Sequence, residues 1–200
     1  VVDNGSTDAT ADIAADSGAT VVAENEAGYG AACHRGIAHI GNADIIVFVD
    51  GDLSDYPEEM HLLVEPIADG HAQLVIGSRT LGTAQRGSLT PQQRFGNMFA
   101  CFLIHRIWGK KYSDLGPFRA IAADALKQIN MRDRGYGWTV EMQVRAIQEG
   151  MAVMEVPVRY RKRIGKSKIS GTVKGTVLAG FTIISTILTA ALSGPGRHRT

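Results

Sequence analysis

The sequence predicts an open α/β fold, a twisted Rossmann-like sheet with helices on both of its faces. Strand-like and helix-like segments alternate along most of the 200 residues, which is the order typical of doubly wound domains. Residues 45–49 are five consecutive apolar residues without polar alternation, as expected of a strand covered by helices on both faces. The length suits one domain with a sizeable core.

The expected strands are short, and each leads into a turn or a loop. They cover residues 1–2, 20–23, 44–49, 73–76 and 152–160. Val1 already lies near the end of a strand-like segment. We therefore expect that this sequence lacks the first βα unit of such a fold.

Helices are expected in most of the intervals between these strands. They cover residues 9–17, 31–40, 57–68, 91–108, 124–129 and 140–148. Ser6 or Thr7 can cap the first helix, and Pro57 and Pro91 stand where a first helical turn tolerates proline. Residues 80–90 are rich in Gly, Ser and Thr and are expected to form a flexible loop.

Composition narrows the class of protein. A net charge of +1 gives no general attraction to nucleic acid. Cys33 and Cys101 lie in apolar, helix-like segments without metal-ligand spacing, so they are expected to be core residues of a protein from a reducing compartment. Basic residues gather between positions 159 and 168, a pattern that fits either a solvated face or a phosphate-binding segment.

The C-terminal segment is unusually apolar. Residues 175–192 are eighteen residues without a charge, at the lower limit of transmembrane length. A spanning helix, an interfacial helix and a helix packed in a soluble core are three alternatives. We expect a globular domain over residues 1–170 and a membrane-associated or interfacial helix within residues 171–200.

Carboxylates follow two of the predicted strands. Asp3 follows the first strand, and Asp50 and Asp52 follow the most hydrophobic one. Ligands of such sheets bind beyond the carboxyl ends of the strands, and two carboxylates that share one point require a cation or a proton. Oxygen ligands suit Mg²⁺ or Mn²⁺. The alternative is helix capping, for which Asp55 alone would suffice.

Two other kinds of site are weighed against this metal site. The Asp-x-Asp pattern is also similar to that of haloacid-dehalogenase-type phosphatases, but those enzymes have Thr or Val where Ser54 stands. A dinucleotide site is conceivable at residues 27–33, but the third glycine of its fingerprint is missing.

Several short motifs occur in a fixed order along residues 1–171. They are Val1–Asp8 (VVDNGSTD), Asn25–Ala31 (NEAGYGA), Asp50–Asp52 (DGD), Gly77–Arg79 (GSR), Asp114–Arg119 (DLGPFR) and Arg163–Lys168 (RIGKSK). This ordered set resembles family 2 glycosyltransferases with the GT-A fold, and within that family it is most similar to the dolichol- or polyprenyl-phosphate hexose synthases. Three positions depart from the family pattern, namely Asn4, Tyr29 and Ser54.

The resemblance implies a role for each matching residue. Asp50, Asp52 and Glu141 would be catalytic, and Asp52 with Asp50 would hold Mg²⁺ or Mn²⁺. The residues implied to bind the nucleotide-sugar donor are Asp3, Asn4, Ser6, Asp8, Gly30, Asp50 and Arg79. Those implied to bind the acceptor phosphate are Arg94, Arg119, Arg161, Arg163, Lys166 and Lys168.

The expected reaction is the inverting transfer of a hexose from a UDP- or GDP-linked sugar to a polyprenyl or dolichyl phosphate. One alternative is a hydroxyl acceptor, for which Glu141 would be the general base. Another is a protein that binds a sugar nucleotide without turning it over. The lipid acceptor implies a membrane surface as a partner, at the inner, cytoplasmic face of the cell membrane, and no nucleic acid.

Overall fold

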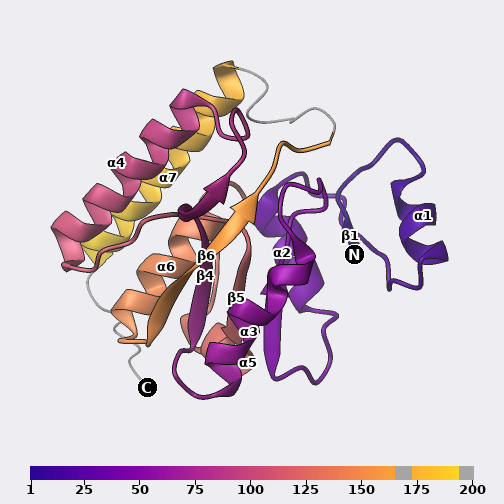
Figure 1. Cartoon of the computed structure of the whole chain (residues 1–200), viewed down its shortest axis with the longest axis horizontal. Helices are drawn as coiled ribbons and strands as arrows, with labels where there is room; N and C mark the ends of the chain where they lie inside the picture. Colours follow the sequence, from indigo (N-terminus) through magenta and orange to yellow (C-terminus); the bar gives the residue numbers. More distant parts are fainter. Residues whose placement is uncertain (165–172, 194–200) are drawn as a thin grey trace.

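The computed structural model describes residues 1–164 and 173–193 of the chain. The strands are β1 (Val2–Asp3), β2 (Val22–Ala23), β3 (Ile45–Phe48), β4 (Leu74–Ala84), β5 (Arg119–Ala122) and β6 (Val153–Tyr160). The helices are α1 (Thr10–Asp16), α2 (Tyr29–Ile37), α3 (Met60–Ala68), α4 (Pro91–Trp108), α5 (Ala123–Ile129), α6 (Trp138–Gln148) and α7 (Val173–Ser193), and a short 3-10 turn, η1 (Pro57–Glu59), precedes α3. This element order confirms the predicted alternation (Figure 1).

Two separate sheets make up the strand layer. β1 and β2 pair in parallel as a two-stranded sheet, whereas the larger sheet has the order β3-β5-β4-β6. In that sheet β4 and β6 are parallel, but β5 runs antiparallel to both of its neighbours. β5 was not among the predicted strands, because four residues beside a helix start carry too little periodicity to be recognised.

Each face of the larger sheet carries its own apolar core. Leu74 and Ile76 of β4 belong to the core that helices α4, α5, α6 and α7 cover. Val75, between them, belongs to the second core, to which α3 contributes Leu63 and Ile67. Because successive side chains of a strand point to opposite faces, this alternation confirms that helices cover both faces of the sheet.

β4 is longer than expected and replaces the first part of the predicted loop 80–90. Its pairing with β6 continues to Ala84 and shifts in register between Ser78 and Thr83. At Gly82 a Cβ atom would lie 2.0 Å from the carbonyl oxygen of Val158. The glycine therefore allows β4 and β6 to approach each other closely. The Gly, Ser and Thr content of this segment had predicted a loop instead.

The apolar C-terminal segment forms α7, which packs beside α4 and against α6 (Figure 1). Ile187 is fully buried, and the side-chain amide of Gln148 donates a hydrogen bond to the carbonyl of Ala190 at 3.0 Å. The expected boundary near residue 170 lies outside the described residues. None of the described helices combines the length and the apolar character needed to cross a membrane.

The glycine-bearing turn before α2 packs on the backbone of residues 133–135. The amide of Gly30 donates to the carbonyl of Gly135 at 3.1 Å, and the next amide donates to the carbonyl of Arg134. A Cβ atom on Gly30 would lie 2.2 Å from the carbonyl oxygen of Asp133. The glycine is therefore needed for a backbone–backbone contact between segments far apart in sequence.

We predict that Gly30→Ala lowers the free energy of unfolding by about 2 kcal/mol or more, because the added methyl group overlaps backbone atoms that cannot move aside freely. Urea unfolding measures this change. Gly96→Ala is the matched control, since a Cβ atom there meets nothing within 4 Å. This α4 substitution should be neutral or stabilise by up to about 1 kcal/mol, and equal effects of the two would contradict the prediction.

Candidate active site

Asp50 and Asp52 lie just after β3 and line one cavity of about 1050 Å³. The cavity separates the two sheets, with Val1 and Val2 on one side and residues 45–52 on the other. Arg163 lines it too, and its guanidinium forms an ion pair with Asp52 at 3.3 Å. The structure thus brings these two predicted metal ligands and one predicted phosphate ligand together.

The turn that carries Asp52 is held from two sides. One carboxylate oxygen of Asp52 accepts a hydrogen bond from the backbone amide of Ser54 at 2.9 Å and another from its hydroxyl. The amides of Arg161 and Ile164 donate to the carbonyls of Ser54 and Asp52, each at 2.9 Å. Leu53, between them, has a positive φ of 60°, an uncommon conformation for a non-glycine residue. The Asp52 carboxylate is therefore positioned before any ligand binds.

The charges of this pair suit a divalent cation. Burial raises the pKa of Asp50, and the neighbouring charge of Asp52 raises this pKa further, whereas Arg163 and the hydroxyl of Tyr29 oppose the shift. A cation would relieve the repulsion. The described residues include no group of three or more His, Cys, Asp or Glu suited to a metal ion. A metal held by Asp50 and Asp52 would therefore need further oxygen ligands from a bound substrate.

Asp55 is a buried carboxyl group close to the same turn. Its side chain is 1% exposed, and among the described residues neither of its carboxylate oxygens makes a hydrogen bond of ordinary geometry. Burial, with the charge of Asp50 adding to it, raises the pKa of Asp55 to about 7. The capping role considered for Asp55 is wrong, because Tyr56 occupies the cap position of η1 without a side-chain bond.

A second cavity, of about 620 Å³, lies between α4, β4 and residues 111–114. Its lining combines the cationic side chains of Arg79, Arg94 and Lys111 with apolar ones that include Met98 and Phe102. Gln93, in the first turn of α4, lines this cavity and also the one that holds Asp50 and Asp52. The two cavities therefore adjoin at the start of α4.

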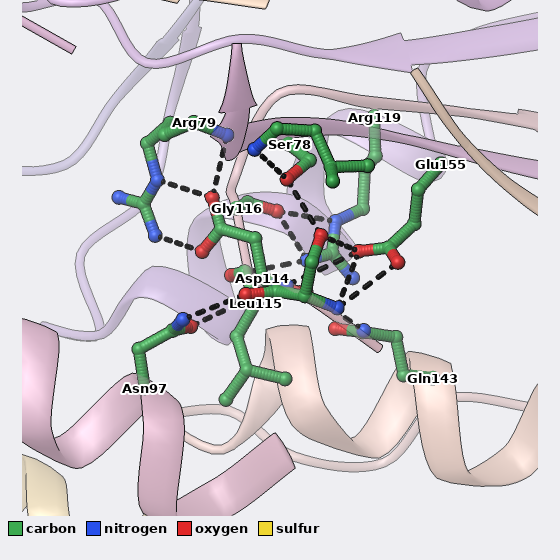
Figure 2. A network of polar contacts seen from close by, with 11 residues as sticks. Ser78, Arg79, Asn97, Asp114, Leu115, Gly116, Arg119, Gln143 and Glu155 are labelled. Carbon is green, nitrogen blue, oxygen red and sulfur yellow. Dashed lines mark hydrogen bonds and ion pairs between the residues drawn. The ribbon is translucent and has the colours of Figure 1, made fainter. Parts of the chain in front are cut away.

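The wall of this second cavity is built around Asp114 (Figure 2). Both of its carboxylate oxygens bind the guanidinium of Arg79, at 2.8 and 2.7 Å, and one of them also accepts the backbone amide of Arg79 at 2.8 Å. Asp114 is 1% exposed and the Arg79 side chain 14%. Such a two-point bond in a dry environment fixes Arg79 firmly.

Four other elements hold the turn that contains Asp114 (Figure 2). The carboxylate of Glu155 on β6 accepts the backbone amides of Ser113 and Asp114 at 3.0 and 3.1 Å. Asn97 of α4 donates to the carbonyl of Ser113 and accepts the amide of Leu115. Gln143 of α6 donates to the carbonyl of Asp114, and Arg119 of β5 donates to carbonyls of the same turn.

The side chains of Arg119 and Glu141 line neither of these two cavities and bind backbone groups instead. Arg119 is fully buried, and its guanidinium donates to the carbonyls of Leu115, Gly116 and Thr139. Glu141 is 7% exposed and accepts the amides of Arg132 and Asp133, besides pairing with Arg145 at 2.7 Å. Both side chains are used to hold backbone turns.

The predicted donor residues near the N-terminus line neither cavity. Asn4 donates to the carbonyls of Glu24 and Glu26 and accepts the amide of Gly28, so its side chain ties down the turn before α2. Asp3 accepts the amide of Ser6, and Asp8 accepts the amide of Thr10. These contacts do not support a base-binding role for Asn4.

The predicted basic residues lie in different surroundings. Arg94 lines the second cavity. The guanidinium of Arg161 lies 4.4 Å from the ring centre of Tyr56 and donates to the carbonyl of Leu53. Lys166 and Lys168 are outside the described residues. Sequence reasoning missed Gln93, Lys111 and Asp114 as site residues, although Asp114 begins a motif that had been identified.

This arrangement, an α/β sheet with an acidic pair after β3 and a cationic cavity beside it, is the kind of site expected of a nucleotide-sugar transferase. A family model described as Glycosyl transferase family 2 matches residues 1–129. The chain belongs to this family, which confirms the resemblance and the expected enzyme class, a glycosyltransferase.

Similar proteins agree with this assignment. An uncharacterized glycosyltransferase of Mycobacterium tuberculosis is 34% identical over 180 residues, which are 90% of this chain and 81% of that protein. An undecaprenyl-phosphate mannosyltransferase of Micrococcus luteus is 33% identical over 145 residues, covering 70% of this chain and 58% of that protein.

Solved structures confirm the GT-A fold. The structure of glucosyl-3-phosphoglycerate synthase from Mycobacterium tuberculosis with Mn²⁺, UDP-glucose and phosphoglyceric acid has a TM-score of 0.74 at 23% sequence identity. The match covers 98% of this chain and 69% of that one.

We predict that Asp55 makes stability fall as pH rises from about 4 to about 7. The unfolded state loses its proton near the usual pKa of 3.8 and the folded state near 7, so in this window the folded state binds more protons and each rise in pH destabilises it. Asp55→Asn should remove this pH dependence, which lowers the free energy of unfolding by up to about 4 kcal/mol between pH 4 and pH 7.

Urea unfolding between pH 4 and pH 8 tests this, with the exposed Asp124→Asn as the control, because 97% of that side chain is open to solvent. An Asp55→Asn protein with the pH slope of the wild type would contradict the assignment.

Proposed function

We propose that the chain transfers a hexose from a UDP- or GDP-linked sugar to a polyprenyl or dolichyl phosphate, with inversion at the anomeric carbon. The observation that carries the proposal is the junction of two unlike cavities at Gln93. One presents the carboxylates of Asp50 and Asp52, suited to a metal-bound diphosphate. The other combines cations with apolar side chains, which suits a phosphate attached to a hydrocarbon chain.

The similar proteins support both halves of this proposal. The mannosyltransferase of Micrococcus luteus is named for an undecaprenyl-phosphate acceptor. The Mycobacterium tuberculosis synthase was solved with Mn²⁺ and UDP-glucose, together with an acceptor that also carries a phosphate. A divalent metal, a nucleotide-sugar donor and a phosphate-bearing acceptor are therefore found together on this fold.

Asp50 and Asp52 would hold the Mg²⁺ or Mn²⁺ ion, which when bound neutralises the leaving diphosphate. Arg163, now paired with Asp52, lies where it could turn to the same phosphates. Asp3, Ser6, Asp8 and Gly30 remain proposed donor contacts on the strength of the family motifs.

The acceptor phosphate would be held by Arg94 in the cationic cavity and by Arg163 in the adjoining acidic one. Arg79, expected to bind the donor, also lines the cationic cavity, where Asp114 holds its guanidinium. A phosphate oxygen is already ionised at neutral pH, so its attack on the anomeric carbon needs no general base. The structure holds Glu141 away from both cavities, which favours this acceptor over a hydroxyl. Since a lipid phosphate lies in a bilayer, we propose that the enzyme works at the inner face of the cell membrane.

The first experiment is sugar transfer from labelled UDP- and GDP-sugars to polyprenyl phosphate in the presence of Mn²⁺. We predict that Asp52→Asn lowers transfer by about 100-fold or more, because it removes a metal-ligand charge yet keeps an oxygen for Ser54 to donate to. The exposed Asp124→Asn is the control. Equal transfer by Asp52→Asn and wild type would refute the metal role, and donor hydrolysis without labelled lipid would favour a hydroxyl acceptor.

We predict that Glu141→Gln reduces kcat by less than about tenfold while it lowers stability by about 1–3 kcal/mol, since the neutral amide loses the ion pair with Arg145 and one of the two acceptor oxygens. A general base would instead contribute about 10²–10⁴-fold to kcat. Parallel measurement of kcat and of the urea midpoint separates the two cases. A loss of kcat in the larger range, in a protein that stays folded, would restore the hydroxyl-acceptor alternative.

A further inference from the structure

α4 leaves an apolar stripe on the outside of the molecule. Phe95, Met98 and Phe102 are 64%, 62% and 57% exposed, and Phe99 is 37% exposed. Their spacing of three, four and seven residues places them on one face of the helix. The opposite face contains Ala100, Cys101 and Ile104, which are buried in the core. The apolar stripe therefore does not contribute to the packing of α4 on the core.

The exposed apolar area of the stripe is larger than that of the single apolar residues found on most protein surfaces. If each of these side chains has about 200 Å² of surface, the four together expose on the order of 400 Å². The rings of Phe95 and Phe99 stack in parallel, with their centres 6.2 Å apart. On α7, which packs beside α4 (Figure 1), Leu178, Phe181 and Leu192 are also exposed.

The chain segments that form β4, α4 and α7 carry positive charge without negative charge. Residues 70–113, which include β4 and α4, contain no Asp or Glu. The same stretch contains six basic residues, Arg79, Arg86, Arg94, Arg106, Lys110 and Lys111. The chain after Glu155, which includes α7, has no Asp or Glu either. Apolar rings beside cations complement a surface that is apolar inside and anionic at its edge.

We propose that α4 lies on an anionic membrane surface, with Phe95, Met98, Phe99 and Phe102 inserted at the level of the lipid headgroups. Met98 and Phe102 also line the cationic cavity. A lipid phosphate that leaves the bilayer beside α4 therefore meets Arg94 and Lys111 without crossing bulk water. The inference rests on the proposed function in one respect, because the lipid acceptor is what gives the docked position its use.

The charge pattern favours a membrane over a second copy of this chain. Two copies joined through the stripe would bring Arg94, Arg106 and the lysines after α4 of one copy close to the same residues of the other. Like charges at such a contact oppose association. An anionic lipid surface instead attracts them.

Flotation of the full chain with vesicles tests the proposal. Wild type should bind mixed phosphatidylglycerol–phosphatidylcholine vesicles and bind pure phosphatidylcholine vesicles more weakly. Phe95→Gln/Phe99→Gln should reduce binding by about tenfold, because it removes two apolar anchors that lie outside the cavity lining. Arg106→Gln/Lys110→Gln should reduce it by about tenfold through lost attraction to the headgroups.

Ile13→Gln is the matched control, since Ile13 is 64% exposed and α1 lies at the far side of the molecule from α4 (Figure 1). Unchanged circular dichroism shows that each variant is folded. Absence of binding by the wild type, or equal binding by wild type and both double variants, overturns the proposal. Self-association that the Phe95→Gln/Phe99→Gln variant loses, without vesicle binding, assigns the face to a second copy and also overturns it.

Transfer to a water-soluble, short-chain prenyl phosphate separates this inference from the proposed function. If the double variants are defective in membrane docking alone, they transfer sugar to the short-chain acceptor as the wild type does. They then lose transfer only to a long-chain acceptor in vesicles. That result supports the proposal. Double variants that lose vesicle binding but transfer sugar to both acceptors like wild type would overturn the docking proposal. A wild type that binds vesicles but labels neither acceptor would count against the proposed sugar transfer and leave the docking proposal standing.

Discussion

The bond between Arg79 and Asp114 is the contact on which the candidate site depends. It joins the middle of β4 to the turn before β5, and both partners are nearly buried. Removing one partner of such a pair leaves an uncompensated charge in a dry environment. The same turn is fastened by Glu155 and Asn97. One wall of the cationic cavity is therefore as rigid as the core behind it.

The acidic cavity is organised differently, because its groups repel one another. Asp50, Asp52 and Asp55 lie within six residues of chain, and burial raises the pKa of both Asp50 and Asp55. The positive charge of Arg163 offsets only part of this. The fold thus tolerates an unfavourable charge density at one point, which is typical of sites whose charge balance a ligand completes.

The sequence was informative wherever one pattern had one physical cause. The apolar run 45–49 predicted a strand, and the motif Asp50–Asp52 predicted an acidic pair; both are present. The expected burial of this strand on both faces is wrong, because β3 is an edge strand and only Ile46 in it is buried. The sequence was misleading where a charged residue can either bind a ligand or hold backbone groups of the protein itself. Arg119 and Glu141 carry charges typical of ligand sites, yet both bind backbone groups, Arg119 the carbonyls of Gly116 and Thr139 and Glu141 the amides of residues 132 and 133. Such partners depend on tertiary packing, which residue spacing does not encode.

The direction of β5 has a geometric consequence for the whole molecule. Arg119, its first residue, pairs with Phe48 at the end of β3 and with Ile76 of β4. Because β5 runs against these strands, the turn that leads into it lies at the edge where β3 ends. A parallel strand in this place would deliver its preceding turn to the opposite edge, roughly four residues or about 13 Å away. One reversed strand thereby sets the acidic pair and the wall of the cationic cavity on the same rim of the sheet.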